Sequence, residues 1–167
     1  MSAAPTSDYS VCTTWGFLAR KWYLLDVFRQ RLDYPDLKRA VIRLHRQWSA
    51  DKVVIEDAGS GKSLWQEFCH QGPFRPLMWS VTQDKETRFV GTLGEVEAGN
   101  LLLPVQAPWL EAFRSELKAF PSGGHDDQVD SFSQFEQFQL NSWKWVETQY
   151  DAKGRPLRVV RKSKREW

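Results

Sequence analysis

The stretch Val53-Val54-Ile55-Glu56-Asp57-Ala58-Gly59-Ser60-Gly61 decides the fold class of this chain. Val53–Ile55 is short and wholly apolar, which is typical of a strand that is buried on both faces and reached through a helical crossover. Before this strand, a helix-start signal at Asp33–Asp36 is followed by apolar residues at helical spacing. A second helical pattern follows the glycine-rich segment. Helix, buried strand and helix in this order predict an α/β fold.

The other elements follow from alternating and amphipathic segments. Ser10–Leu18 and Trp22–Arg29 are rich in β-branched and aromatic residues and are separated by a tight polar turn, so they predict an antiparallel hairpin. Further strands are expected at Pro76–Val81 and Leu101–Leu103. Further helices are expected at Ser63–His70, Trp109–Phe120 and His125–Leu140, with a loop at Ala58–Gly61 and a partly helical Lys85–Glu97. This pattern predicts a mixed sheet flanked by helices.

Length and composition favour one ordinary domain. Among the 167 residues are 9 Trp and 10 Phe, enough large side chains for an aromatic core and too many for a disordered chain. No apolar segment is long enough to span a membrane, so no membrane partner is expected. The 2 cysteines form no CxxC motif, which excludes a disulfide scaffold and fits a reducing cytoplasm.

Charge is distributed unevenly along the chain. Residues 151–167 contain 7 basic and 2 acidic residues, whereas residues 1–150 contain 16 basic and 19 acidic ones. We therefore expect a folded domain over 1–150 and a mobile basic tail over 151–167. Such a tail is suited either to contacts with nucleic-acid phosphates or simply to solvation as a terminal extension. Its candidate DNA-binding residues are Arg161, Lys162, Lys164 and Arg165.

The segment Gly59–Ser63 is similar to a phosphate-binding loop because it follows a strand and precedes a helix. Such a loop needs a glycine five residues before its Gly-Lys pair, so that backbone N–H groups surround the phosphates. Glu56 occupies that position, and a carboxylate there repels a triphosphate. The sequence therefore disfavours an ATP site.

Two separate groups of carboxylates form a candidate metal site. Glu56 and Asp57 end the buried strand, where α/β sheets place ligands. Asp126 and Asp127 precede the last helix, with Asp130 one turn further on. Adjacent carboxylates repel one another unless a cation compensates them, and oxygen ligands suit Mg²⁺ or Mn²⁺. In the alternative interpretation Asp126 caps the last helix and Asp127 complements its dipole.

The order of these segments resembles a ribonuclease H-like nuclease, and more narrowly the C-terminal nuclease domain of phage terminase large subunits. The resemblance runs from about residue 8 to residue 139. It rests on these matching segments: Asp8–Gly16, Trp22–Arg29, Tyr34–Leu37, Val54–Gly61, Asp84-Lys85 with Arg88, Glu97–Gly99, Leu103-Pro104, Ala107–Leu110, Phe120-Pro121 and His125–Asp130.

The resemblance implies two-metal hydrolysis of DNA with Mg²⁺ or Mn²⁺ as cofactor. Glu56 and Asp127 then become metal ligands and catalytic residues, with Asp126 beside them, and the three should converge in space. Asp57, Asp8 and Asp130 are weaker ligand candidates, and Lys85 and Arg88 match basic positions that contact DNA. The implied partners are double-stranded DNA, the portal protein and the small terminase subunit, in the cytoplasm of a bacterial host.

The chain departs from the family at its start. In the family the first catalytic aspartate lies on a central first strand, and residues 1–7 contain neither a carboxylate nor a strand signal. The hairpin over 10–29 therefore matches the second and third strands, and the domain is expected to be incomplete at its N-terminus, without the ATPase half. We expect the chain alone to be inactive or weak as a nuclease. The alternative is an inactive prophage remnant that binds DNA or packaging partners.

Overall fold

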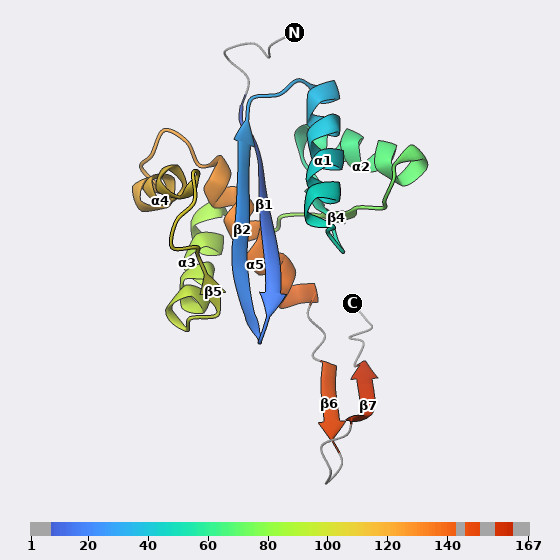
Figure 1. Ribbon diagram of the computed structural model, residues 1–167. Coiled ribbons are helices and arrows are strands. Elements are labelled where there is room, and N and C mark those ends of the chain that lie inside the picture. The colour runs from blue at the N-terminus through green and yellow to red at the C-terminus, as the bar shows by residue number, and fades with distance from the viewer. Residues whose placement is uncertain (1–7, 143–145, 151–155, 162–167) are drawn as a thin grey trace.

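The computed structural model describes residues 8–142, 146–150 and 156–161 (Figure 1). It opens with a long antiparallel hairpin of β1 (Ser10–Leu18) and β2 (Lys21–Gln30). In the turn between them, Ala19 and Arg20 have φ of 50° and 64°. Two successive left-handed residues match the twist of the paired strands, as in a type I′ turn. The expected hairpin is confirmed.

Helix α1 (Tyr34–Trp48) follows the hairpin, and its start obeys the sequence signal. The Asp33 side chain accepts a hydrogen bond from the backbone N–H of Asp36 at 2.9 Å, which satisfies one of the free donors of the first turn. Ala40 and Leu44 are buried on the inner side of the helix. Its outer side carries exposed arginines.

Strand β3 (Val54–Glu56) leads directly into α2 (Gly59–Gln71) and then to β4 (Leu77–Trp79), which pairs with β3 in parallel. The expected loop at Ala58–Gly61 is wrong, because α2 already begins at Gly59. A Cβ on Gly61 would lie 2.4 Å from the carbonyl oxygen of Glu56. Glycine here lets the helix start against the end of the strand.

The second half of the chain is mainly helical. It comprises α3 (Lys85–Glu97), β5 (Leu101–Leu102), α4 (Leu110–Ala119) and α5 (Asp127–Ser142). β5 pairs in parallel with β2, so the sheet that contains the hairpin is mixed. The segment 85–97 is helical throughout, rather than only in part as expected.

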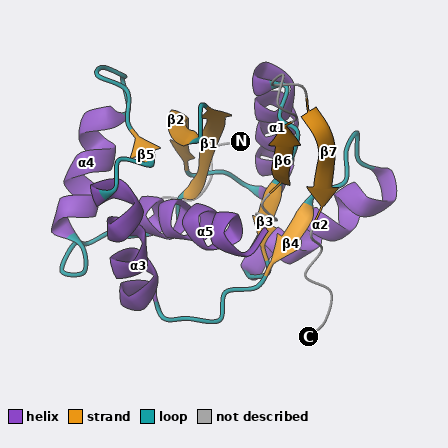
Figure 2. Ribbon diagram, turned by 90° about the horizontal axis from the view of Figure 1, so that it is seen from below, coloured by secondary structure: helices purple, strands orange, loops and turns teal. Residues whose placement is uncertain are grey.

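The described strands do not form one continuous sheet. They form three: β1-β2-β5, β3-β4, and the pair β6 (Val146–Tyr150) and β7 (Pro156–Arg161). Helix α5 packs along β1, and its C-terminal part reaches β4 of the second sheet (Figure 2). Trp15 of β1 stacks on Phe135 with centroids 4.0 Å apart, and Trp79 of β4 meets Phe138 at 5.6 Å. The first two sheets therefore both contact α5 but do not pair with each other.

The boundary expected between residues 150 and 151 falls inside the β6–β7 hairpin. Residues 156–161 belong to the expected mobile basic tail, but they form a strand that the sequence pattern did not predict. Arg161 ends this strand, whereas Lys162, Lys164 and Arg165 lie outside the described residues. Within the described residues, no helix is long and apolar enough to cross a membrane.

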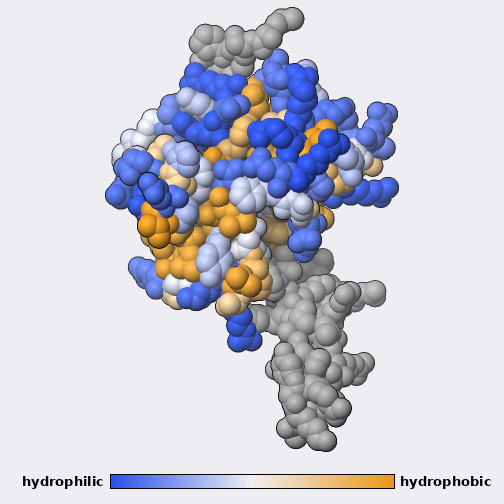
Figure 3. Space-filling view, viewed as in Figure 1, coloured by the Kyte–Doolittle hydropathy of each residue, from blue (hydrophilic) through white to orange (hydrophobic). Residues whose placement is uncertain are grey.

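Two hydrophobic clusters hold the elements together. The larger one joins β2, β5, α4 and α5 through Leu24, Val27, Leu101, Phe113 and Phe132. The smaller one joins Ile55 of β3 to Leu64 and Phe68 of α2, with α1 packed against it. The surface is uneven: in Figure 3 apolar side chains gather over α3 and the tip of the β1–β2 hairpin, where Val90 and Leu18 are exposed. The first cluster fixes the start of α5, where the candidate site lies.

Candidate metal site at the start of α5

The paired carboxylates lie where α5 begins. Asp127 is its first residue, Asp126 precedes it, and the backbone N–H of Asp130 donates to the carbonyl oxygen of Asp126 at 2.9 Å. One turn further along, Phe132 packs edge-on against Phe113 of α4 with centroids 5.7 Å apart. This aromatic contact in the larger core cluster holds the carboxylate-bearing turn in place.

A buried glutamate of α4, Glu116, caps the first turn of α5. Glu116 accepts two hydrogen bonds from Gln128, from the backbone N–H at 2.6 Å and from the side-chain Nε2 at 2.5 Å. Arg29 of β2 lies 3.6 Å from the same carboxylate. The alternative interpretation of the sequence placed the cap at Asp126, and neither interpretation indicated Glu116. No local sequence signal connects Glu116 to Gln128, which is 12 positions further along the chain.

Two cations of α3 bind the acidic side chains of α5. The Lys85 ammonium lies 2.7 Å from a carboxylate oxygen of Asp126 and 2.7 Å from one of Asp130. Arg88 is buried, and its guanidinium pairs with the other oxygen of Asp130 at 2.5 Å. Burial opposes protonation of Lys85, but the two carboxylates outweigh it and raise the pKa of Lys85. Lys85 and Arg88, expected to contact DNA, thus contact the carboxylate cluster.

Asp127 differs from its two neighbours because none of the described residues forms an ion pair with it. Burial raises the pKa of Asp127, and the negative charges of Glu116 and Asp126 raise it further; Arg29 and His125 act in the opposite direction. A carboxylate destabilised in this way gains most from a nearby cation. Asp127 is therefore the carboxylate of this turn that a hard divalent cation would stabilise most.

The second carboxylate group lies at the end of β3, as expected. Glu56 is the last residue of that strand. Asp57 accepts a hydrogen bond from the Ser80 hydroxyl at 3.1 Å, and the Lys62 ammonium lies 3.5 Å from its other oxygen. Lys62 is in the first turn of α2 and faces a carboxylate.

Asp8 is exposed and lies two positions before the first residue of β1. The next residue, Tyr9, meets the His125 ring edge-on at 5.4 Å, and the Arg29 guanidinium lies 3.6 Å above the Tyr9 ring. These contacts bring the start of β1 to the start of α5, although more than a hundred residues separate them in sequence. Asp8 is thus on a segment that borders the Asp126–Asp127 turn.

Among the described residues, no three His, Cys, Asp or Glu side chains are grouped closely enough to hold one metal ion. The structure therefore does not bring Glu56, Asp126 and Asp127 together into one three-carboxylate centre. The physical reason is the interrupted sheet: Glu56 belongs to the β3-β4 sheet, whereas the start of α5 is held by the core of the β1-β2-β5 sheet.

Comparison with known proteins supplies the family. No curated protein matches the chain. The family model of the terminase RNaseH-like domain matches residues 1–136, from the hairpin through the first turns of α5. This match includes both carboxylate groups and agrees with an α/β fold that has a mixed sheet. The chain therefore belongs to the terminase RNaseH-like domain family.

Proposed function

We propose that this domain is a divalent-metal-dependent endonuclease that cuts concatemeric double-stranded viral DNA during packaging, in the cytoplasm of an infected bacterium. Asp127 is the observation that carries the proposal. It is a partly buried carboxylate beside two further acidic groups, and no cation of the described chain forms an ion pair with it. Membership of the terminase RNaseH-like family makes DNA the natural substrate class.

The residues that would hold Mg²⁺ or Mn²⁺ are Asp126 and Asp127 of the α5 turn, with Asp8 as a further candidate. Glu56 and Asp57 are proposed as ligands from the end of β3, although the described structure does not group them with the α5 turn. A bound divalent cation supplies Lewis-acid stabilisation of phosphate charge and lowers the pKa of water. The chain's own contribution is positional. Glu116 fixes the first turn of α5 through Gln128, so that Asp127 is held in a defined orientation.

Cleavage of supercoiled plasmid by the purified chain tests this proposal. We expect weak nicking that requires Mn²⁺ and stops in EDTA. Asp127→Asn and Glu56→Ala should each lower the nicking rate at least about tenfold, because each removes a charged ligand. Glu111→Gln changes an exposed carboxylate of α4 and is the matched control. Nicking that persists in EDTA, or that both variants retain, would contradict the proposal.

Removal of the Lys85 ammonium, which pairs with Asp126 and Asp130, should strengthen metal binding. In the Lys85→Ala variant Asp126 loses its cationic partner and Asp130 keeps only Arg88. Because partly exposed ion pairs contribute up to about 1 kcal/mol, Mn²⁺ should bind about fivefold more tightly. Titration calorimetry measures this, with Lys118→Ala on α4 as the control. Unchanged Mn²⁺ affinity in Lys85→Ala would show that Asp126 and Asp130 do not bind the metal.

A second candidate function is a binding module without catalysis, which contacts DNA, the portal protein or the small terminase subunit. The Lys85 bridge favours it, because an ammonium group already neutralises two of the acidic side chains. The separation of β3 from the β1-β2-β5 sheet favours it as well. DNA binding without any Mn²⁺-dependent nicking would support this candidate over the first.

A further inference from the structure

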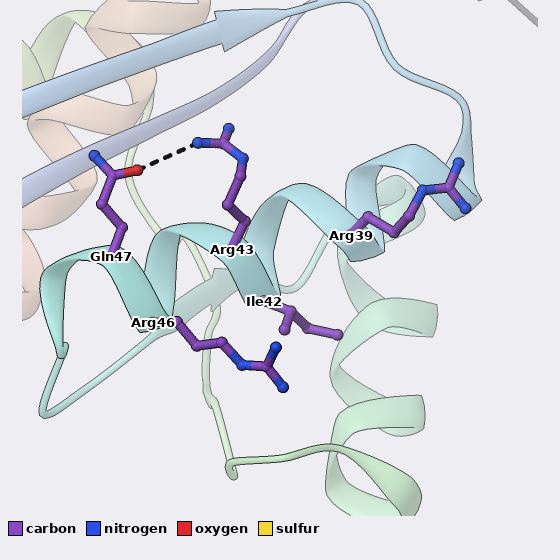
Figure 4. A pocket seen from close by; sticks show the side chains of 5 residues that line it. All are labelled: Arg39, Ile42, Arg43, Arg46 and Gln47. Carbon is purple, nitrogen blue, oxygen red and sulfur yellow. Dashed lines mark hydrogen bonds between the residues drawn. The ribbon is translucent and has the colours of Figure 1, made fainter.

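Helix α1 presents an arginine face that the candidate metal site does not involve. Arg39, Arg43 and Arg46 recur at helical spacing on its outer side, and all three are exposed. Together with Ile42 and Gln47 they line an open pocket of about 590 Å³ (Figure 4). The opposite side of α1 is buried against α2 and β3. The face is thus a continuous basic surface on a helix that is anchored from behind.

Contacts among the described residues leave two of these three arginines without a carboxylate partner. Arg39 pairs with Asp36 of its own helix. Arg43 donates to the Gln47 side-chain oxygen at 3.3 Å, and its guanidinium lies 5.4 Å from the Phe28 ring centre, so both of its neighbours are uncharged. Among the described residues, no carboxylate forms an ion pair with Arg43 or Arg46.

Helix stability does not explain the arrangement either. Cations in the last turn are favoured by the helix dipole, which accounts for Arg46. Arg39 lies beyond the first turn, where the dipole has little effect, and its pair with Asp36 accounts for it locally. Arg43 has neither explanation. Like charges three and four positions apart destabilise a helix by about 0.2–0.5 kcal/mol per pair, so Arg43 between Arg39 and Arg46 is a small cost to α1 when no anion is bound.

The geometry selects an extended polyanion over a single small anion. Residues 39 to 46 span about 10 Å along the helix axis at 1.5 Å per residue. In Figure 4 the three guanidinium groups point in different directions rather than toward one point. Successive phosphates along one DNA strand advance by about 3.4 Å along the duplex axis and also rotate around it, so this length is sufficient to meet more than one of them. Arginine also binds phosphate oxygens with two parallel hydrogen bonds.

We infer that the arginine face of α1 binds the phosphate backbone of double-stranded DNA. The choice of DNA among extended polyanions rests on the proposed function. The contact is independent of sequence, because phosphate contacts position the duplex without reading its bases. The contact orients the duplex on the domain through α1, a helix that carries none of the candidate metal ligands.

Fluorescence anisotropy with a labelled duplex, in EDTA and across a salt series, tests the inference without any cleavage. The variant combines Arg39→Gln, Arg43→Gln and Arg46→Gln. The control combines Arg75→Gln, Arg114→Gln and Lys118→Gln, which removes the same charge from exposed positions elsewhere. The face variant should bind about tenfold more weakly at low salt. Its slope of log affinity against log salt should fall by about 0.9 for each DNA phosphate that the face no longer neutralises.

Equal affinity and slope in the face variant and the natural chain would overturn the inference. An equal decrease in the control would do so too, because net charge alone would then account for it. Binding of a poly-glutamate peptide that depends on the face, without binding of duplex, would replace DNA by an acidic protein partner. Metal-dependent nicking that survives in the face variant at unchanged DNA affinity would leave the proposed function intact and refute only this inference. DNA binding that depends on the face, without nicking, would support this inference and contradict the proposed nuclease function.

Discussion

Relative to the natural chain, the Glu136→Gln variant should gain about 2–3 kcal/mol in free energy of unfolding when the pH is raised from 5 to 8. Glu136 lies on α5 and is almost fully buried, and one of its carboxylate oxygens has no hydrogen-bond partner among the described residues. Burial, followed by the negative charge of Glu95 on α3, raises the pKa of Glu136 to about 7.

The sign follows from proton uptake. The ordinary pKa of this side chain is 4.5, so between pH 4.5 and about 7 the folded chain keeps a proton that the unfolded chain has released. The contribution of Glu136 to stability is therefore fully present below pH 4.5 and is lost as the pH rises toward 7. Glutamine has nearly the same shape and does not ionise, so its contribution does not decline with pH.

Urea unfolding at pH 5 and pH 8 measures the effect as the difference between variant and natural chain, so that all other titrating groups cancel. Glu95→Gln should produce a smaller change in the same direction, because it removes only the second cause. Glu111→Gln, at an exposed position of α4, is the control. A difference between Glu136→Gln and the natural chain that is the same at both pH values would contradict the argument.

The elements that sequence could predict are those with local signals. The β1–β2 hairpin follows from its β-branched strands and short turn, and the start of α1 follows from Asp33 and the proline behind it. Helix α3 is harder to predict from sequence because its buried side is polar and apolar residues lie on its exposed side. Arg88 and Thr92 are its buried residues, whereas Val90 is 65% exposed. A hydrophobic pattern assigns the wrong face when an ion pair holds the inner side of a helix.

The candidate site could be predicted only as a set of carboxylates. Their positions at the end of β3 and the start of α5 are as expected, because both follow from the order of the elements. What the sequence does not contain is the partner of each charge. Lys85 meets Asp126 across 41 positions and Arg88 meets Asp130 across 42. Such pairs depend on the packing of α3 against α5, which no local pattern encodes.

Glu116 is the clearest case of a side chain whose role depends on tertiary contacts. Glu116 and Glu111 both lie on α4, and they differ in that Glu116 is buried whereas Glu111 is exposed. The Glu116 side chain is 7% exposed and binds both donors of Gln128, which is itself 2% exposed. Both hydrogen bonds are therefore made away from bulk solvent.

The Glu116→Ala variant is therefore expected to lose about 3 kcal/mol of unfolding free energy. Two buried donors on Gln128 lose their acceptor, and an unsatisfied buried group costs about 1–3 kcal/mol. Arg29, at 3.6 Å, loses its carboxylate as well. The Glu111→Ala control removes only a favourable first-turn charge, so its effect should stay within about 0.3–1 kcal/mol. Urea unfolding at neutral pH measures both variants. Because Glu116 also fixes the turn that carries Asp127, Glu116→Ala should in addition weaken Mn²⁺ binding under conditions where the chain remains folded. Equal stability of the two variants would show that α5 is capped by other groups, and that Glu116 does not position the carboxylates.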